Sequence, residues 1–229
     1  MTRWAYLGCA LLLASCSDTG LNPIVGAVIR EANPLQRDAP EAARPAVPQI
    51  TRAAVNRADT AMIRARLVDE EARSYLVATS ANGGYVTYAS PIRQAMTLNG
   101  SFVTGTRGLG HDLLSARSSG PDPLVRAIPP SAWPAGVMRS YEFPAEGARG
   151  RIETYDCRFA LEEISEIVIL QQRHRGIQVT ETCANAEGSF ENLHFADLRT
   201  GFVWRSLQWT GPRQGLVDLE VVLPYTGSD

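Results

Sequence analysis

Residues 95–104 read AMTLNGSFVT, and this stretch carries the clearest structural signal in the chain. The pair Asn99-Gly100 stands between two runs in which apolar and polar side chains alternate. Asn and Gly tolerate the positive φ angles that both central residues of a tight hairpin turn require. The pattern therefore predicts an antiparallel hairpin between residues 95–98 and 101–104.

Further β-forming stretches lie on both sides of this hairpin. They are residues 61–68, 74–79, 85–88, 151–161, 165–172, 177–183, 202–209 and 216–223. Residues 118–148 contain six prolines and read as a loop. Thr51 is placed to cap a short helix through Arg57. No helical stripe is long enough for a βαβ crossover, so we expect a mostly β fold: an antiparallel half-barrel or barrel-like sheet with few short helices.

The composition excludes several classes of protein. The chain has 229 residues, of which 45% are hydrophobic and 20% charged, as in an ordinary packed soluble domain. Its net charge is −2 and no basic stripe is evident, which argues against nucleic acid as a partner. All 22 basic residues are arginine, which fits codon bias in a GC-rich genome or bidentate recognition of carboxylates and phosphates.

The N-terminus has the features of a bacterial lipoprotein signal. Arg3 precedes an apolar run, residues 4–14, that is too short to cross a hydrocarbon core of ~30 Å as a helix. The run ends in Leu13-Ala14-Ser15-Cys16, which looks like a lipobox. There the Cys16 thiol receives diacylglyceryl, with acyl chains such as palmitate, and becomes the new N-terminus. An ordinary secretory signal with an incidental cysteine is the alternative.

These features divide the chain into three expected segments. Residues 1–15 form the signal peptide, residues 16–50 a lipidated Pro/Ala-rich tether, and residues 51–229 a single β-rich domain. Ser17, rather than an aspartate, follows the lipidated cysteine. This favours the outer membrane, with the protein lipid-anchored on the periplasmic side.

Two cysteines remain after the signal peptide and Cys16 are set aside. Cys157 and Cys183 lie 26 positions apart, and an even pair in an exported chain suggests a disulfide. Its contribution would be roughly 3.5 kcal/mol in the chain-entropy model. Two buried thiols or a metal site are the alternatives. Neither cysteine has the CxxC spacing or the histidine pattern of a zinc site, so we expect no metal.

Three segments, taken in order, resemble the YjbF/GfcB family of lipoproteins, which is named for group 4 capsule polysaccharide. They are the sequence TRGLGHDL at residues 106–113, the Cys157 and Cys183 pair, and TGFVWRSLQWTGP at residues 200–212. The resemblance covers roughly residues 50–225. It implies a β-rich, half-barrel-like domain with a role in secreting or assembling capsule or other exopolysaccharide. It supplies no active-site residues and no cofactor, so none are carried over.

The segment after the central hairpin is the best candidate for a binding loop: Arg107, Gly108, Gly110, His111 and Asp112. His111 and Asp112 have the chemistry of an acid–base pair, but neighbours on an extended chain point to opposite faces, so they would need a turn to meet. No nucleophile motif accompanies them. The alternative is a glycine-rich loop in which Asp112 caps Leu113-Leu114. Arg107 offers a bidentate donor to an anionic sugar or a carboxylate.

Three other clusters have a functional and a structural interpretation. Arg173-His174-Arg175 could meet lipid headgroups or acidic polysaccharide, or it could be a solvated hairpin end. The aromatic residues Trp204, Trp209 and Tyr225 could stack on sugars or fill the core. The carboxylates Glu162, Glu163 and Glu166 could suggest glycoside cleavage, but their clustering at an expected turn favours plain solvent exposure.

The leading functional hypothesis is a non-enzymatic accessory or scaffold in exopolysaccharide or capsule production or export. Its expected partners are the membrane, through the lipid anchor, and envelope polysaccharide-export proteins or the polysaccharide itself. The alternative is a carrier that holds a lipid or amphiphile in a half-barrel groove. A third hypothesis is a polysaccharide-modifying enzyme that uses His111.

Overall fold

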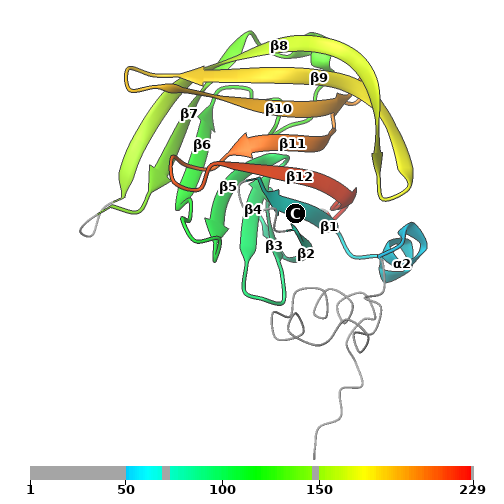
Figure 1. The fold of residues 1–229 in the computed structure, drawn as a ribbon. Coiled ribbons are helices and arrows are strands. Elements are labelled where there is room, and N and C mark those ends of the chain that lie inside the picture. Colours follow the sequence, from blue (N-terminus) through cyan, green and yellow to red (C-terminus); the bar gives the residue numbers. More distant parts are fainter. Residues whose placement is uncertain (1–49, 69–72, 146–149, 228–229) are drawn as a thin grey trace, which may run out of the picture.

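The computed structural model describes residues 50–68, 73–145 and 150–227. The predicted signal peptide, Cys16 and all of the predicted tether except Ile50 lie outside these residues. The described strands form one antiparallel 12-stranded sheet, which curls until its two edges approach each other (Figure 1). The mostly β, barrel-like fold expected from the sequence is thereby confirmed.

The strands vary from five to nineteen residues in length. In chain order they are β1 (Met62–Leu67), β2 (Arg73–Asn82), β3 (Tyr85–Ala89), β4 (Ala95–Asn99), β5 (Phe102–Arg107), β6 (Ser115–Ser119), β7 (Gly136–Phe143), β8 (Arg151–Ile169), β9 (Gln172–Ala184), β10 (Ser189–Asp197), β11 (Val203–Trp209) and β12 (Leu216–Leu223). The helix α2 (Arg52–Ala58) precedes them, and a short 3-10 helix (Pro130–Ala132) lies before β7.

The order of the strands in the sheet is β5-β4-β3-β2-β1-β12-β11-β10-β9-β8-β7-β6. Strands that follow one another in sequence are therefore neighbours, except β5 and β6, which form the two edges. In the middle of the sheet β1 pairs with β12, from Met62 opposite Leu223 to Leu67 opposite Val217. The edge strands β5 and β6 contact each other, but no hydrogen-bonded ladder joins them in the described residues. The sheet is thus an almost closed barrel with one seam.

Helix α2 packs against the strands at one end of this barrel. The Thr51 hydroxyl accepts a hydrogen bond from the Ala54 amide at 3.2 Å, which confirms the predicted N-cap. Arg52 donates to the carbonyl oxygens of Ile169, at 2.8 Å, and of Val222. Val55 packs with these strands in a small second core. The helix therefore attaches the N-terminal end of the described chain to the ends of β8 and β12.

The central hairpin forms as predicted, with its turn one residue further along. Asn99 pairs with Phe102, so the turn residues are Gly100 and Ser101. Gly100 has a φ of +61°, and it takes the first central position, which glycine occupies in type II′ hairpin turns. A Cβ at Gly100 would lie 2.3 Å from the Leu124 carbonyl oxygen, so glycine is also needed for close approach.

The prediction of loop for residues 118–148 is wrong in its second half, because it misses β7. Five of the six prolines precede this strand, and within it the residues are alternately exposed and buried. The inward positions hold Val137, Arg139, Tyr141 and Phe143. An arginine in this inward series hides the alternation of apolar and polar residues that identifies a strand.

The two strands expected at residues 151–161 and 165–172 are a single strand, β8. A β-bulge between Leu161 and Ile164 accommodates the extra residue without ending the strand. The turn to β9 falls at Leu170 and Gln171, both with positive φ, as the central residues of a type I′ turn require. No Asn-Gly signal marks it. Arg173-His174-Arg175 therefore lies inside β9 and not between strands.

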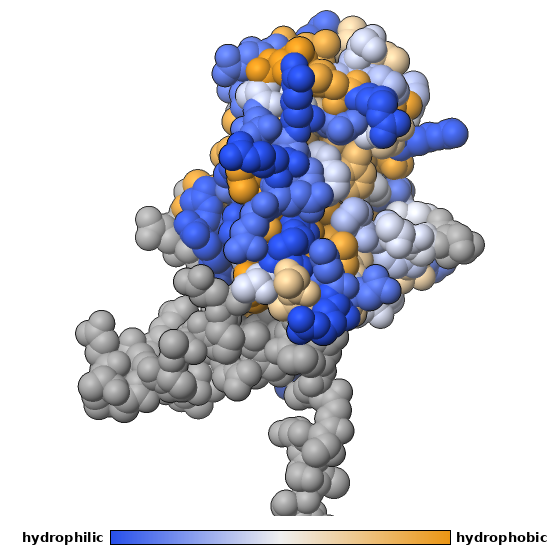
Figure 2. Space-filling view, turned by 90° about the vertical axis from the view of Figure 1, so that its right-hand side faces the viewer, coloured by the Kyte–Doolittle hydropathy of each residue, from blue (hydrophilic) through white to orange (hydrophobic). Residues whose placement is uncertain are grey.

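The second half of β8 is a free edge of the sheet. Its pairing with β7 ends at Arg158, and beyond it no described strand covers this side. Leu161, Ile164 and Val168 are exposed there. Figure 2 shows hydrophobic residues gathered at the top of the molecule, where β8 arches in Figure 1, above a largely hydrophilic face. The bulge and the neighbouring glutamates are features with which natural proteins discourage pairing at an edge.

Candidate functional site

The predicted binding loop lies between β5 and β6, and Asp112 organises it. The Asp112 carboxylate accepts hydrogen bonds from the amides of Gly108, at 2.9 Å, and Leu109, at 3.1 Å. The Thr106 hydroxyl donates to it at 3.3 Å. Gly108 and Gly110 have φ angles of +76° and +101°, which explains why the tight loop contains glycine. The Asp112 carboxylate thus accepts hydrogen bonds from residues that precede it in the chain, whereas the sequence suggested that it caps Leu113-Leu114, which follow it.

The loop is joined through His111 to the turn at the end of the third family-like segment, residues 200–212. The His111 amide donates to the Gln214 side-chain oxygen at 3.1 Å. Gln214 is buried in the turn between β11 and β12, which directly follows residues 200–212. Two motifs that are almost 100 residues apart in sequence therefore meet at one end of the barrel. We call the depression between them the end hollow. Its volume is about 190 Å³, and it is lined by Gly110, His111, Asp112, Phe143, Pro144, Arg151, Gly211, Pro212, Arg213 and Gln214.

The rim of the end hollow carries positive charge. Arg151 and Arg213 are exposed, as is His111, while Phe143 is buried at the hollow's base. Glu153 pairs with Arg151 at 2.8 Å and neutralises part of this charge. The guanidinium of Arg151 also lies 5.9 Å from the centre of the Phe143 ring. The arrangement suits a carboxylate or phosphate group.

The arrangement does not form the acid–base pair considered from the sequence. All three of Asp112's hydrogen-bond donors belong to its own loop, and no hydrogen bond joins its carboxylate to the His111 ring in the described residues. The lining of the end hollow contains no hydroxyl or thiol side chain. The end hollow therefore offers neither a hydrogen-bonded His–Asp pair nor a serine, threonine or cysteine nucleophile among the described residues.

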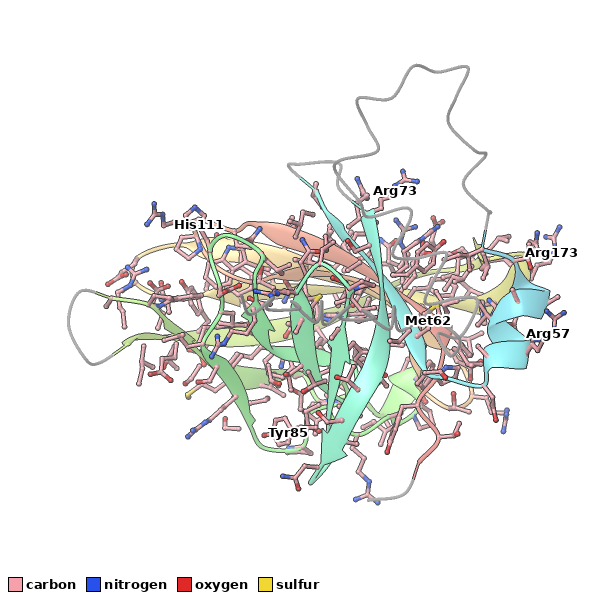
Figure 3. All side chains as sticks on the ribbon, turned by 90° about the horizontal axis from the view of Figure 1, so that it is seen from below. Arg57, Met62, Arg73, Tyr85, His111 and Arg173 are labelled. Carbon is pink, nitrogen blue, oxygen red and sulfur yellow. A yellow bond between two sulfur atoms is a disulfide. The ribbon has the colours of Figure 1, made fainter. Side chains whose placement is uncertain are left out.

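The structure separates Arg107 from the rest of the predicted loop. The Arg107 side chain lies on the outer face of the sheet, at the seam between β5 and β6, where Arg117 is its neighbour across the groove. His111 instead faces the end hollow. The five loop residues therefore do not form one surface: Arg107 belongs to the outer face at the seam, and His111 belongs to the end hollow. Figure 3 shows His111 at one end of the barrel and Arg57 and Arg173 at the other.

The interior of the barrel holds an ionic network that the sequence did not reveal. Arg139 is fully buried and donates to Glu181 at 2.5 Å and to Asp122 at 2.6 Å. His194 and Asn192 contact the second oxygen of Glu181 at 3.0 and 2.8 Å. Arg139 also stacks on Phe102, with 4.2 Å between the guanidinium carbon and the ring centre. The buried charges are therefore paired and hydrogen-bonded, as burial demands.

This network fixes the protonation of Glu181. Burial by itself raises the pKa of the carboxyl, but the Arg139 charge and the hydrogen bonds from His194 and Asn192 outweigh it and lower the pKa to about 2. The two carboxylates in turn outweigh the desolvation of Arg139 and raise its pKa. Glu181 is thus a carboxylate at neutral pH and acts as a structural anion, not as a general acid.

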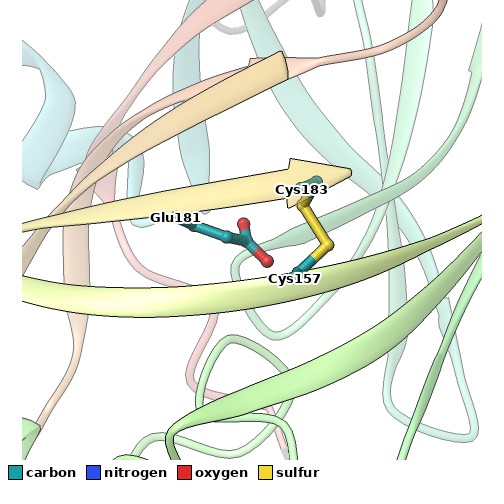
Figure 4. Close-up of side chains that lie close together, drawn as sticks. All are labelled: Cys157, Glu181 and Cys183. Atoms are coloured by element: carbon teal, nitrogen blue, oxygen red, sulfur yellow. A yellow bond between two sulfur atoms is a disulfide. The ribbon is translucent and has the colours of Figure 1, made fainter. Parts of the chain in front are cut away.

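The cysteine pair lies next to this network. Cys157 of β8 and Cys183 of β9 are directly opposite each other and form a disulfide, which is the pairing expected from the sequence. Figure 4 shows the Glu181 carboxylate beside the bridge. Glu181, Cys157 and Cys183 are close enough to ligate a metal ion. A metal would need the two thiolates, however, and the disulfide consumes both.

The aromatic candidates for sugar stacking belong mostly to the protein's own packing. Trp209 stacks on Phe190, with 4.2 Å between ring centres, and both pack against the main core. Trp204 lies on the opposite face of β11, as predicted, and stacks on His174 at 3.9 Å. Tyr225 is partly exposed beside an apolar hollow near the C-terminal end of β12.

The charged clusters also have structural roles. Arg173 and Arg175 are exposed, but His174 between them is buried, so the cluster does not present three cations on one surface. Glu166 pairs with Arg173 at 2.5 Å, while Glu162 and Glu163 are solvent-exposed. Their exposure agrees with the sequence-based interpretation. Their placement does not, because all three glutamates lie along β8 and not at a turn.

Comparisons with known proteins agree with the fold and the motifs. A family model for the group 4 capsule polysaccharide lipoprotein, described as gfcB or YjbF, matches residues 37–222. The crystal structure of the hypothetical lipoprotein YmcC from Escherichia coli (K12) is similar, with a TM-score of 0.66 and 20% sequence identity. The match covers 78% of this chain and 91% of that chain. No curated protein matches the chain. No helix in the described residues is long and apolar enough to cross a membrane.

Proposed function

Because the chain belongs to the YjbF family of group 4 capsule polysaccharide lipoproteins, we propose that it is a non-enzymatic accessory or scaffold in exopolysaccharide or capsule production or export. It is anchored to the outer membrane through lipid on Cys16 and faces the periplasm. Its partners are the polysaccharide or the envelope proteins that export it.

One observation carries this proposal: the hydrogen bond between the His111 amide and Gln214 joins the loop of the first family-like segment to the turn at the end of the third, so that both segments line one surface. That surface is rimmed by Arg151 and Arg213, and its lining contains no hydroxyl or thiol side chain. Such a surface supports binding of an anionic group on a polymer or on a partner protein.

The position of the end hollow also supports a binding role. The N-terminal end of the described chain joins the barrel through α2 and Met62, which pairs with Leu223 at the end of β12. The end hollow lies at the beginning of β12, on Gln214 and its neighbours. The strand's eight residues separate the two ends by roughly 26 Å at ~3.3 Å per residue. A tether attached before α2 would thus join the domain at the end opposite the end hollow.

The proposal is tested by secreted polymer in a deletion strain. The strain is complemented with the wild-type gene or with Cys16→Ala, and exopolysaccharide is measured. We expect the polymer to be reduced by the deletion, restored by the wild type and not restored by the variant that lacks the lipidated thiol. Unchanged polymer in the deletion strain contradicts the accessory role, and full restoration by C16A contradicts the need for the anchor.

A second candidate function, a lipid or amphiphile carrier, is favoured by an apolar hollow at the end of the barrel where β12 ends. Its volume is about 290 Å³, and Ile63, Val86, Leu98 and Phe202 are among its lining residues. This lies at the lower limit of small-molecule pockets, and aromatic side chains fill the interior beyond it. Native mass spectrometry distinguishes the two functions: a co-purified lipid that survives in the gas phase supports the carrier, and a bare protein supports the scaffold.

A further inference from the structure

The seam between the edge strands opens a polar groove on the outer face of the sheet. We call it the seam groove; its volume is about 360 Å³, and the residues that matter here are Thr87, Thr97, Gly105, Arg107, Ser115 and Arg117. A second hollow of about 300 Å³ crosses β6 and β7 and shares Ser115 and Arg117 with the first. The two hollows together make a track that runs across the strands.

Hydroxyl side chains follow this track in register. Thr87 of β3 is opposite Thr97 of β4, and their hydroxyl oxygens are 3.1 Å apart. Beyond the seam, Ser140 of β7 is opposite Thr154 of β8, with hydroxyl oxygens also 3.1 Å apart. Neighbouring strands are ~4.8 Å apart, which is close to the length of one sugar ring in an extended chain. A glycan lying across the strands would meet a polar group at nearly every strand.

The middle of this row is empty of side chains. Thr97 is opposite Gly105, the residue on β5 that borders the seam. A Cβ at Gly105 would lie 3.5 and 3.7 Å from its nearest neighbours, two backbone carbonyl oxygens. These are ordinary contact distances, so the position has room for a side chain, and close packing does not require glycine there. The absence of a side chain leaves the groove open between Thr97 and the seam.

Positive charge is concentrated in the seam groove. Arg107 and Arg117 are exposed in it, and no acidic side chain is part of its lining. In the described residues neither arginine forms a salt bridge, and Arg107 donates only to the neighbouring Thr106 carbonyl, at 2.9 Å. Glu142 lies in the second hollow, where Ser115 donates to it. A carboxylate on a ligand would therefore find its donors at the seam.

Exposed apolar side chains border the track at both ends. Tyr85 lies at the β3 end and is 44% exposed, and Figure 3 shows it on a different side of the barrel from His111. Met138 and Ile152 lie at the other end and are 47% and 66% exposed. Apolar and aromatic surfaces of this kind cover the C–H faces of sugar rings, while hydroxyl groups of the ring meet the polar row.

We propose that the seam groove binds an acidic polysaccharide, a chain containing uronic acid or a similarly carboxylated sugar, laid across strands β3 to β8. Arg107 and Arg117 bind its carboxylates, and the row of threonine and serine hydroxyls binds its neutral hydroxyl groups. This inference rests on the proposed function, because it identifies the polymer itself as a ligand of the accessory protein.

Two variants test the groove by different physical means. Gly105→Gln fills it without changing charge, and Arg117→Gln removes one cation without adding bulk. Arg175→Gln is the matched control, because Arg175 is exposed on β9, away from the groove. The full chain is purified in detergent and titrated calorimetrically with oligogalacturonate as the acidic probe and cellohexaose as the neutral probe. Circular dichroism confirms that each variant is folded, and Thr97→Val replaces G105Q if that variant does not fold.

We expect the wild type and R175Q to bind oligogalacturonate with the same Kd, and G105Q and R117Q to bind it at least tenfold more weakly. Cellohexaose should bind the wild type at least tenfold more weakly than oligogalacturonate. The proposal is overturned if the wild type does not bind oligogalacturonate, if both groove variants bind it normally, or if the neutral probe binds equally well.

Complementation separates this proposal from the accessory role. If the wild type does not restore polymer in the deletion strain, the accessory role fails whatever the groove binds. If the wild type and G105Q restore polymer equally, the accessory role stands and the groove is overturned as the polymer's site. Restoration by the wild type and R175Q but not by G105Q supports both.

Discussion

Acid should weaken the fold through one buried carboxylate, Glu181. Its pKa is lowered from 4.5 to about 2 in the folded protein, chiefly because Arg139 outweighs the effect of burial. A lowered folded-state pKa stabilises the protein above the unfolded-state value and loses that stabilisation as the pH falls toward the folded-state value. The difference corresponds to about 3 kcal/mol at pH 7, of which about 2 kcal/mol is lost by pH 3.

The assay is urea unfolding between pH 7 and pH 3 for the wild type and Glu181→Gln. Glutamine keeps one oxygen for the Arg139 hydrogen bond and does not titrate, while its amide nitrogen takes the place of the oxygen that Asn192 and His194 contact. We expect E181Q to be less stable than the wild type by about 3 kcal/mol at pH 7 and by only about 1 kcal/mol at pH 3. Other carboxylates titrate in both proteins and cancel in the difference.

The control variant is Glu191→Gln, because Glu191 is exposed on the same strand as His194. It should follow the wild-type stability at every pH within about 0.5 kcal/mol. If the stability difference between the wild type and E181Q is constant from pH 7 to pH 3, the pairing with Arg139 does not lower the pKa of Glu181, and our account of the network is wrong.

Three further predictions concern stability and the loop. Gly100→Ala should lower the free energy of unfolding in urea by at least about 2 kcal/mol, because the residue has positive φ and its new methyl group would lie 2.3 Å from a carbonyl oxygen. The control is Gly188→Ala, which has open space around it and should lower the free energy of unfolding by less than about 1 kcal/mol. Replacing Cys157 and Cys183 together by alanine should lower the free energy of unfolding by roughly 3.5 kcal/mol, and an unchanged urea midpoint would show that the bridge is not formed in the exported protein. His111→Ala should change stability by less than about 0.5 kcal/mol, because the backbone amide that donates to Gln214 is kept. It should restore polymer fully in the deletion strain, because Arg151 and Arg213 keep the charge of the end hollow; loss of polymer with normal protein levels would show that the His111 side chain itself is required.

The elements that were predictable from sequence are those whose inward positions are apolar. The final strand, β12, was expected at residues 216–223 and is found there. The Asn99-Gly100 hairpin, the Thr51 cap and the disulfide also follow from local chemistry that acts within a few residues or from cysteine count alone. Even there the exact turn position depended on Gly100 fitting against Leu124, a contact that no local pattern contains.

Two of the elements that were missed, β7 and β10, carry much of the buried ionic network, although Glu181 lies on β9, a strand that was expected at residues 177–183. β7 brings Arg139 inward, and β10 brings Asn192 and His194 inward. Polar residues at inward positions cancel the alternation by which a strand is recognised. Their ion-pair and hydrogen-bond partners lie on other strands and loops. The interactions that offset the cost of burying these polar groups can therefore be recognised only in the three-dimensional structure. The end hollow is a similar case: His111 was singled out, but its connection to Gln214 needed the fold.

The pairing of β1 with β12 has a consequence for how the protein folds. These strands lie at opposite ends of the domain's sequence and yet form the middle of the sheet. Each hairpin on either side can form from its own neighbours, but the two halves can be joined only after the last strand has been synthesised. Such long-range pairing carries a large loop-closure entropy and slows folding. A chain that stops before Leu216 therefore leaves β1 and β11 as two open edges in the middle of the sheet and does not form a slightly smaller barrel. The final eight-residue strand joins the two halves and so makes the twelve strands one cooperative unit.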